Sequence, residues 1–260
     1  MKTKLLISTL GLSFVLASPL MAATTGTVYQ NGTSNSATVT QHDNWNASTA
    51  ISVHGGHNTT NVAQHDNKEV TAVMNTHGYN NSSHIQQVDN DWGVEGRVDV
   101  FNGSNNYGYV ETIRVADGKA SIVVTNSTGN TNKILNSDTW VSRATISGYN
   151  AHSNQATIIQ DNEGHHGYSY NLKASITQNN AWHNTAGIDQ RGVNQDAAIL
   201  QTGSHNTAGI NQREGGWDAN KATINQNGSY NQAFINQRGQ NLTGTLTQVG
   251  TSNVAYLSQQ

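Results

Sequence analysis

The chain has 260 residues, no cysteine, 34% hydrophobic and 11% charged residues, 35 Asn, 19 Gln and 25 Gly, and a formal net charge of −3. A globular enzyme normally carries close to half apolar and about a quarter charged residues, so an ordinary single-core enzyme is disfavoured. Disorder is disfavoured as well, because it accompanies high net charge and few β-branched residues, whereas Val, Ile and Thr recur here. An uncharged, amide-rich and glycine-rich chain favours a repetitive β structure.

Residues 1–23 have the features of a secretory signal peptide. Lys2 and Lys4 precede an apolar run from Leu5 to Leu16, and small residues follow at the expected cleavage position. The alternative, a transmembrane anchor, is disfavoured because the run is too short to cross a bilayer, so we predict secretion and no membrane span. Removal of Lys2 and Lys4 would leave 13 − 2 = 11 basic against 16 acidic residues, a net charge of −5. That balance predicts no nucleic-acid partner.

Residues 24–93 repeat with a period of 23. Gln41, Gln64 and Gln87 keep this spacing, and the glycine, asparagine and Val/Ile positions around them keep it too. Residues 151–260 contain a shorter unit with the consensus Q-x-G-x-x-N-x-A-x-I-x-Q, in which small or aliphatic residues replace Ala and Ile. Two of these half-units make one repeat of 22 to 26 residues. A fixed period of this length predicts a stack of structural repeats.

Within each half-unit, the Asn, Ala, Ile and Gln positions alternate with other residues. Alternation with period two predicts a strand with those four side chains on one face, and the glycine predicts a turn. Identical repeats stacked in register place Gln over Gln and Asn over Asn at about 4.8 Å, so that side-chain amides bond along the stack. The sequence therefore predicts an all-β fold, a β-solenoid of strand–turn–strand repeats that forms cross-β structure on assembly.

The predicted assembly site consists of the inward columns of this solenoid. The ladder and core positions are Gln30, Asn35, Val39, Gln41, Asn58, Val62, Gln64, Asn81, Ile85, Gln87, Asn154, Ile158, Gln160, Gln178, Asn184, Ile188, Gln190, Ile199, Gln201, Asn206, Ile210, Gln212, Ile224, Gln226, Asn231, Ile235, Gln237, Gln248, Asn253, Leu257 and Gln259. The predicted turn glycines are Gly32, Gly55, Gly78, Gly192, Gly203, Gly228, Gly239 and Gly250. The consensus continues to Gln259, which leaves no evident cap on the stack and favours addition of another copy.

Residues 94–150 are a degenerate version of the repeat. Seven charged residues are expected to interrupt the amide ladders there: Glu95, Arg97, Asp99, Glu111, Arg114, Asp117 and Lys119. Two sets of residues are expected to keep the frame of the consensus, namely Gly103, Asn106, Gly108 and Val110, and Gly129, Asn132 and Ile134. Two interpretations remain open, namely sequence drift and a gatekeeping role in which charges delay self-assembly.

Turn residues offer weaker candidates for binding. His42 and His65, and likewise His54 and His77, are expected to stack on neighbouring repeats, and so are Asp43, Asp66 and Asp89. Solvent-facing turn residues and a weak metal site are both compatible with this pattern, but no known ligand spacing supports a metal, and no cofactor is predicted. Trp45, Trp92, Trp140, Trp182 and Trp217 lie near turns, where they either bind sugars or pack over neighbouring turns.

These repeated units behind a secretory signal resemble the curlin repeats of curli fimbrial subunits, the secreted functional-amyloid proteins of Gram-negative biofilms. The resemblance covers residues 28 to 260, most strongly 30 to 90 and 151 to 260. It implies a structural, non-enzymatic subunit that polymerises with itself into extracellular fibres for adhesion and biofilm matrix. It also implies a companion subunit, an outer-membrane secretion pore and periplasmic chaperones as partners.

Two features depart from that family. First, the repeats begin within about seven residues of the predicted cleavage site, so the leader that targets the major curli subunit to its secretion pore is expected to be missing or short. Second, the chain has room for about ten repeats, roughly double the number in a typical curli subunit. The alternative function is a monomeric secreted solenoid that acts as an adhesin or binds ice or carbohydrate. No catalytic motif such as G-x-S-x-G occurs in the sequence, so no enzymatic activity is predicted.

Overall fold

The computed structural model describes residues 12–16, 25–41, 46–65, 69–88, 93–113, 117–125, 128–137, 141–150, 152–161, 171–214 and 218–260. Apart from isolated bridges, their regular structure is entirely β-strand, in two sheets. One sheet contains β1 (Leu12–Leu16), β3 (Ser36–Gln41), β5 (Thr59–Gln64), β7 (Ser82–Val88), β9 (Tyr107–Ile113), β11 (Thr131–Ser137), β13 (Gln155–Asp161), β15 (Thr185–Arg191), β17 (Thr207–Arg213), β19 (Gln232–Arg238) and β21 (Val254–Gln259). The other contains β2 (Thr25–Thr33), β4 (Asn46–Gly56), β6 (Glu69–Tyr79), β8 (Val94–Ser104), β10 (Asp117–Thr125), β12 (Val141–Tyr149), β14 (Asn171–Trp182), β16 (Gln195–Ser204), β18 (Asn220–Ser229) and β20 (Thr243–Thr251).

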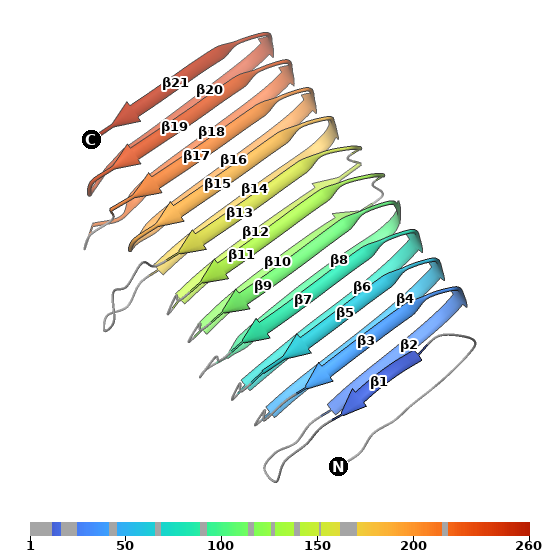
Figure 1. Cartoon of the computed structure of the whole chain (residues 1–260). Helices are drawn as coiled ribbons and strands as arrows, with labels where there is room; N and C mark the ends of the chain where they lie inside the picture. The colour runs from blue at the N-terminus through green and yellow to red at the C-terminus, as the bar shows by residue number, and fades with distance from the viewer. Residues whose placement is uncertain are drawn as a thin grey trace.

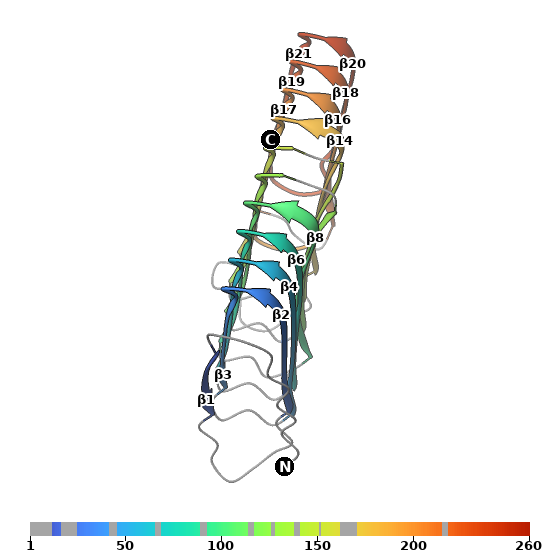
Figure 2. The same cartoon turned by 90° about the vertical axis from the view of Figure 1, so that its right-hand side faces the viewer.

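The chain alternates between these two sheets, so that each even-numbered strand and the odd-numbered strand after it form one rung. Every pairing between neighbouring rungs is parallel, and equivalent residues of successive repeats face each other, as Ile188, Ile210 and Ile235 do. The rungs from β2–β3 to β20–β21 follow one another along a single axis (Figure 1). Seen from the side, the two sheets form two thin layers (Figure 2). The predicted β-solenoid is confirmed.

A narrow apolar core runs between the two layers for the length of the stack. Inward side chains alternate with outward ones, as in β15, where Ala186, Ile188 and Gln190 are buried and the residues between them are partly exposed. The predicted core positions with at most 3% exposure are Val39, Val62, Ile85, Ile158, Ile188, Ile199, Ile210, Ile224 and Ile235. Leu257 is packed against the same core but only partly buried. One rung contributes only a few of these side chains, so the core exists only because rungs are stacked.

The turns between the layers use a repeated backbone conformation. All eight predicted turn glycines have φ values between 102° and 129°. We call the turn that joins an even strand to the following odd strand an arc. In each arc, the residue before the consensus asparagine of the repeat has positive φ even when it is not glycine, as in His205 (57°) and Tyr230 (57°). This conformation is costly for a bulky residue, but each arc is hydrogen-bonded to the next, for example from Tyr230 N–H to the Ser204 carbonyl at 3.0 Å.

The described residues between 94 and 150 form rungs like the others, and the charged side chains described there do not enter the inward columns. Glu95, Arg97 and Lys119 stand at positions that alternate with buried Gly96, Val98 and Ala120. Asp99 also faces away from the core, although it is only 1% exposed, because it pairs with Arg97 and accepts a hydrogen bond from Asn75. The prediction that charges interrupt the ladders was therefore wrong for these residues. The side chains of Arg114 and Asp117 lie outside the described residues.

The N-terminal strand β1 pairs with β3, with Phe14 opposite Val39. This strand falls within the predicted signal peptide, whose remaining residues lie outside the described part of the chain. In the part of the chain that the structure describes, no helix has the length and apolar character needed to cross a membrane.

Candidate functional site

An asparagine ladder links the described rungs from end to end. In each arc the asparagine Oδ1 accepts a hydrogen bond from the main-chain N–H of the asparagine one rung later, as from Asn206 to Asn184 at 2.8 Å. In several rungs the Nδ2 atom of the later asparagine donates to the same oxygen, as from Asn81 to Asn58 at 3.1 Å. The predicted members are Asn35, Asn58, Asn81, Asn154, Asn184, Asn206, Asn231 and Asn253. Their buried polar groups are thus satisfied by the next rung.

Asn106, which was expected to keep the frame, and Asn130, which was not, complete this ladder through the degenerate region. Asn106 N–H donates to Asn81 Oδ1 at 3.2 Å, and Asn130 N–H donates to Asn106 Oδ1 at 3.0 Å. The expected alignment of Gly129 and Asn132 with the consensus was wrong by two residues, because the ladder asparagine of this rung is Asn130 and not Asn132. Asn132 lies instead in the alanine column, opposite Gly108 and Ala156, although Ile134 does occupy its expected core column.

Two glutamine ladders occupy the C-terminal half, one in each sheet. In the odd-strand sheet, Nε2 of each glutamine donates to Oε1 of the next, at 2.8 to 2.9 Å. In the even-strand sheet the same bonds measure 2.9 to 3.0 Å. Most of these amides also donate to a main-chain carbonyl of the facing strand, as Gln190 does to Lys173 at 2.9 Å. The members are Gln160, Gln190, Gln212, Gln237 and Gln259 in one ladder and Gln178, Gln201, Gln226 and Gln248 in the other.

The asparagine and glutamine ladders donate in opposite directions. Within the asparagine ladder, the main-chain N–H of each later asparagine donates to Oδ1 of the asparagine one rung before it, as Asn231 does to Asn206. Several Nδ2 groups also donate to a main-chain carbonyl of the rung after them, as Asn206 does to Gly228. Each glutamine donates to the rung after it, as Gln212 does to Gln237. The stack therefore has two different kinds of end, which bears on how a further rung would add.

The glutamine columns differ in the N-terminal half. Gln30 faces Val53 on the next rung, not a second glutamine, and Val53 faces Thr76. Gln64 accepts a hydrogen bond from Thr49 Oγ1 at 3.1 Å. The backbones of Gln41, Gln64 and Gln87 stack as predicted, but the side chains of Gln41 and Gln87 lie outside the described residues. Here the core columns and the asparagine ladder continue without a described glutamine ladder.

The rung formed by β20 and β21 leaves its inward face partly open. Ala255 and Leu257 are half-buried, whereas Ala233 and Ile235, their equivalents on β19, are at most 1% exposed. Gln259 donates to the Thr243 carbonyl at 3.1 Å and accepts from Gln237, but its side chain is also only half-buried. This rung presents the same kinds of side chain that the C-terminal rungs use to hold their neighbours.

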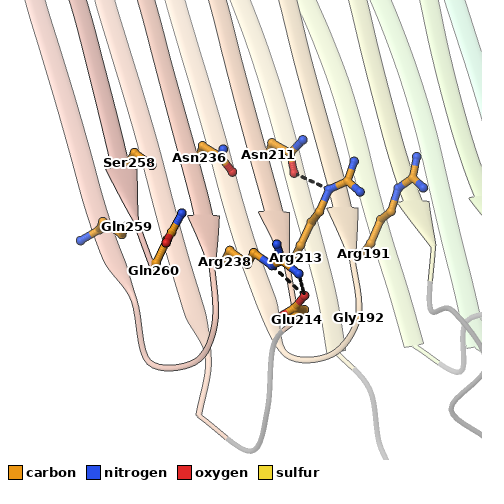
Figure 3. Close-up of a pocket in the computed structure, with 10 residues that line it drawn as sticks. All are labelled: Arg191, Gly192, Asn211, Arg213, Glu214, Asn236, Arg238, Ser258, Gln259 and Gln260. Atoms are coloured by element: carbon orange, nitrogen blue, oxygen red, sulfur yellow. Dashed lines mark hydrogen bonds and ion pairs between the residues drawn. The ribbon is translucent and has the colours of Figure 1, made fainter.

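A polar pocket lies at the turn edge of the same rungs (Figure 3). Arg191, Arg213 and Arg238 stack in one column of the odd-strand sheet. Each is matched with an acid: Arg191 with Asp189 at 3.2 Å, Arg213 with Asp189 at 3.6 Å, and Arg238 with Glu214 at 2.7 Å. The hydrogen bond to Glu214 and its negative charge raise the pKa of Arg238. These pairs explain the arginine column without a ligand.

Histidine rings stack on the outside of the N-terminal rungs. The His54 and His77 ring centroids lie 4.7 Å apart, with Tyr29 and Phe101 at either end of the column. Burial, and secondarily the charge of His54, lowers the pKa of His77. Among the described residues, no three His, Cys, Asp or Glu side chains are grouped to hold a metal.

Other predicted turn candidates fall largely outside the described part of the chain. His42, Asp43, Asp66, Asp89, Trp45, Trp92, Trp140 and Trp217 all lie outside it. Trp182 is 55% exposed and lies 4.9 Å from the ring of His152.

Comparison with known families supports the repeat assignment. A family model described as the curlin associated repeat matches residues 184–213, which contain the rung β16–β17 and strand β15 of the rung before it. The matched segment begins at ladder residue Asn184 and includes Gln190, Gln201, Asn206 and Gln212. No curated protein matched the chain by sequence. The molecule is thus a β-solenoid that carries a curlin-like repeat, the class of structural, non-enzymatic repeats to which that family belongs.

Proposed function

We propose that this protein is a secreted structural subunit that self-assembles into curli-like extracellular fibres for adhesion and biofilm matrix. The observation that carries the proposal is the unbroken asparagine ladder, through which each described rung is held by identical bonds to the next. Because these bonds are the same at every step, they can also join the last rung of one copy to the first rung of another. The match to the curlin associated repeat supports the same conclusion.

In this proposal a second copy adds at an end of the stack, for example against the rung β20–β21. Leu257 would gain the burial that Ile235 already has, and the exposed strands would gain a parallel partner. A companion subunit, a secretion pore and chaperones belong to the same proposal, because an exported chain with an open edge needs protection before assembly. Fluorescence of thioflavin T against time, followed by fibre diffraction, tests assembly. Reflections near 4.7 and 10 Å are expected.

A pair of substitutions on β21 distinguishes ordered stacking of rungs from non-specific aggregation. Leu257 points into the core, whereas its neighbour Tyr256 points outward and is 66% exposed. We expect Leu257→Lys to block fibre growth, because a lysine would be buried without a partner at the joint between copies, and Tyr256→Lys to leave it nearly unchanged. A chain that stays folded and monomeric under all conditions would overturn the proposal and favour the monomeric adhesin.

A further inference from the structure

The outer face of the even-strand sheet carries a repeated pattern of a cation followed by a hydroxyl. Residues 119–122 read Lys-Ala-Ser-Ile, residues 143–146 read Arg-Ala-Thr-Ile, and residues 173–176 read Lys-Ala-Ser-Ile. In each, the alanine and the isoleucine are buried in the core, so the cation and the hydroxyl point outward. The core requirement fixes the small and aliphatic positions, but nothing in the core requires a cation at the outward one.

The register brings these outward groups into two straight columns. Lys119 pairs with Arg143 and Arg143 with Lys173, so the three cations lie on adjacent strands about 4.8 Å apart. Their hydroxyl neighbours form the second column. We call these six residues the cationic strip: Lys119, Arg143, Lys173, Ser121, Thr145 and Ser175. Glu95 on β8 and Asp196 on β16 bound the strip at its two ends.

The three cations are exposed, and none forms an ion pair with a described residue. Like charges at this spacing repel each other, and an anion beside the column would relieve that repulsion. The arginine column of the other sheet differs, because each of its arginines forms an ion pair with Asp189 or Glu214. Among the described residues, the strip and the arginine column are thus two stacked rows of cations; Glu95 and Asp196 lie beside the two ends of the strip, but its three cations form no ion pair with them, whereas the arginines do pair with acids.

We propose that the cationic strip binds a linear acidic polysaccharide, a polymer that carries one carboxylate or sulfate on each sugar or every few sugars. A straight row of cations on flat, parallel strands is complementary to an extended polyanion, and the neighbouring hydroxyls supply hydrogen bonds to sugar hydroxyls. The strip has no aromatic side chain on which nucleic-acid bases could stack and no apolar residue that could enter a lipid layer. The polysaccharide is the occupant that these residues favour.

This binding does not depend on self-assembly, because the strip lies on the outer face of the sheet and not at the end of the stack. It also gives the charges of residues 94–150 an interpretation besides drift and gatekeeping, since Lys119 is the first member of the strip. If copies stack into a fibre, the strip recurs once in each copy and multivalent binding follows.

Binding of the full chain to polygalacturonate, measured by biolayer interferometry at about 50 mM salt and again at about 300 mM, tests the proposal. The variant Lys119→Gln/Arg143→Gln/Lys173→Gln removes the strip. The matched control, Lys133→Gln/Arg213→Gln/Arg238→Gln, removes three positive charges from the other sheet. We expect the unmodified chain to bind more weakly at the higher salt, the strip variant to lose about tenfold in affinity, and the control to stay within about twofold. Neutral dextran should not bind.

Several results would overturn the proposal. Equal affinity of the strip variant and the unmodified chain would exclude these residues, and equal losses in the strip variant and the control would assign binding to total charge. Tighter binding of an oligothymidylate or of phosphatidylglycerol vesicles through the same residues would replace the polysaccharide with another polyanion. Circular dichroism checks that the strip variant folds. If it does not, Arg143→Gln alone at the centre of the row should lower affinity about twofold, and an unchanged affinity would overturn the proposal.

Discussion

The main-chain N–H and the side-chain Nδ2 of Asn231 both donate to Oδ1 of Asn206, at 3.0 and 3.1 Å. Asn206 in turn donates to the carbonyl of Gly228 at 2.9 Å, so one buried amide connects two arcs. Because both asparagines have 0% exposure, no water can replace these partners without opening the stack.

Replacing Asn206 with Ala should therefore be far more destabilising than replacing a surface asparagine. The change leaves the Asn231 N–H buried and unpaired, so we expect the free energy of unfolding to fall by about 3 kcal/mol and fibre growth to slow. Chemical denaturation and thioflavin T kinetics measure the two effects. Asn227→Ala, on the exposed face of β18, is the control and should be neutral within about 0.5 kcal/mol. Similar losses in both variants would contradict the ladder.

Gly228 and Gly187 give opposite expectations for the same substitution. A Cβ at Gly228, where φ is 128°, would lie 1.9 Å from the carbonyl oxygen of Gly250, whereas a Cβ at Gly187 would meet nothing within 4 Å. We expect Gly228→Ala to cost about 3 kcal/mol or more in unfolding free energy, and Gly187→Ala to be neutral or slightly stabilising. Thermal and chemical unfolding of the two variants compares them directly. A stable Gly228→Ala chain would show that the arcs need not approach so closely.

Asn136 marks a site where the stack can be improved. It has 0% exposure, lies in the glutamine column opposite Gln160, and neither of its amide atoms finds a hydrogen-bond partner among the described residues. Asn136→Gln should reach the Gln160 amide and raise the free energy of unfolding by about 1 kcal/mol. Asn136→Leu should also stabilise, because it removes the unpaired polar group. Destabilisation by both variants would mean that Asn136 has a partner in solution.

Acid should weaken the N-terminal rungs. The pKa of His77 is lowered in the folded chain, by burial and then by the charge of His54, so the unfolded chain binds a proton more readily. The stability that a neutral His77 provides is present above the ordinary imidazole pKa of about 6.5 and is lost as pH falls through the lower folded value. Hydrogen exchange of the β4 and β6 amides at pH 7 and pH 5 measures this loss. His77→Gln should reduce the difference, and an identical difference would exclude His77 as its source.

The period of the sequence was sufficient to predict the solenoid and most of its columns. Alternation with period two determined which residues of β15 and β17 face inward, and the 23-residue spacing predicted the register of β3, β5 and β7. The ladder could be anticipated because an Asn or a Gln that recurs at an inward position needs a buried hydrogen-bond partner, and its own copy on the next rung lies within reach.

The predictions that the structure contradicts concern residues whose local sequence pattern is compatible with two different positions in a rung. Gly129 adopts a φ of 63°, the conformation that His57 and Asn105 adopt in their arcs, so it does not occupy the glycine column and the frame shifts by two residues. Gln30 fitted the consensus, but its partner Val53 depends on the neighbouring rung, which a motif within one half-unit does not specify. The number of charged residues also did not reveal that Glu95 and Lys119 point outward, because this depends on which alternate positions of the strand face the core.

The opposed donor directions of the two amide ladders make the stack vectorial. Beyond Asn253, the asparagine Oδ1 offers an acceptor for a further main-chain N–H, while beyond Gln259 the glutamine Nε2 offers a donor for a further amide oxygen. A copy joined in the reverse sense would bring acceptor against acceptor in one column and donor against donor in the other. Head-to-tail joining keeps donors facing acceptors in both columns, so a filament of this protein would have two distinguishable ends.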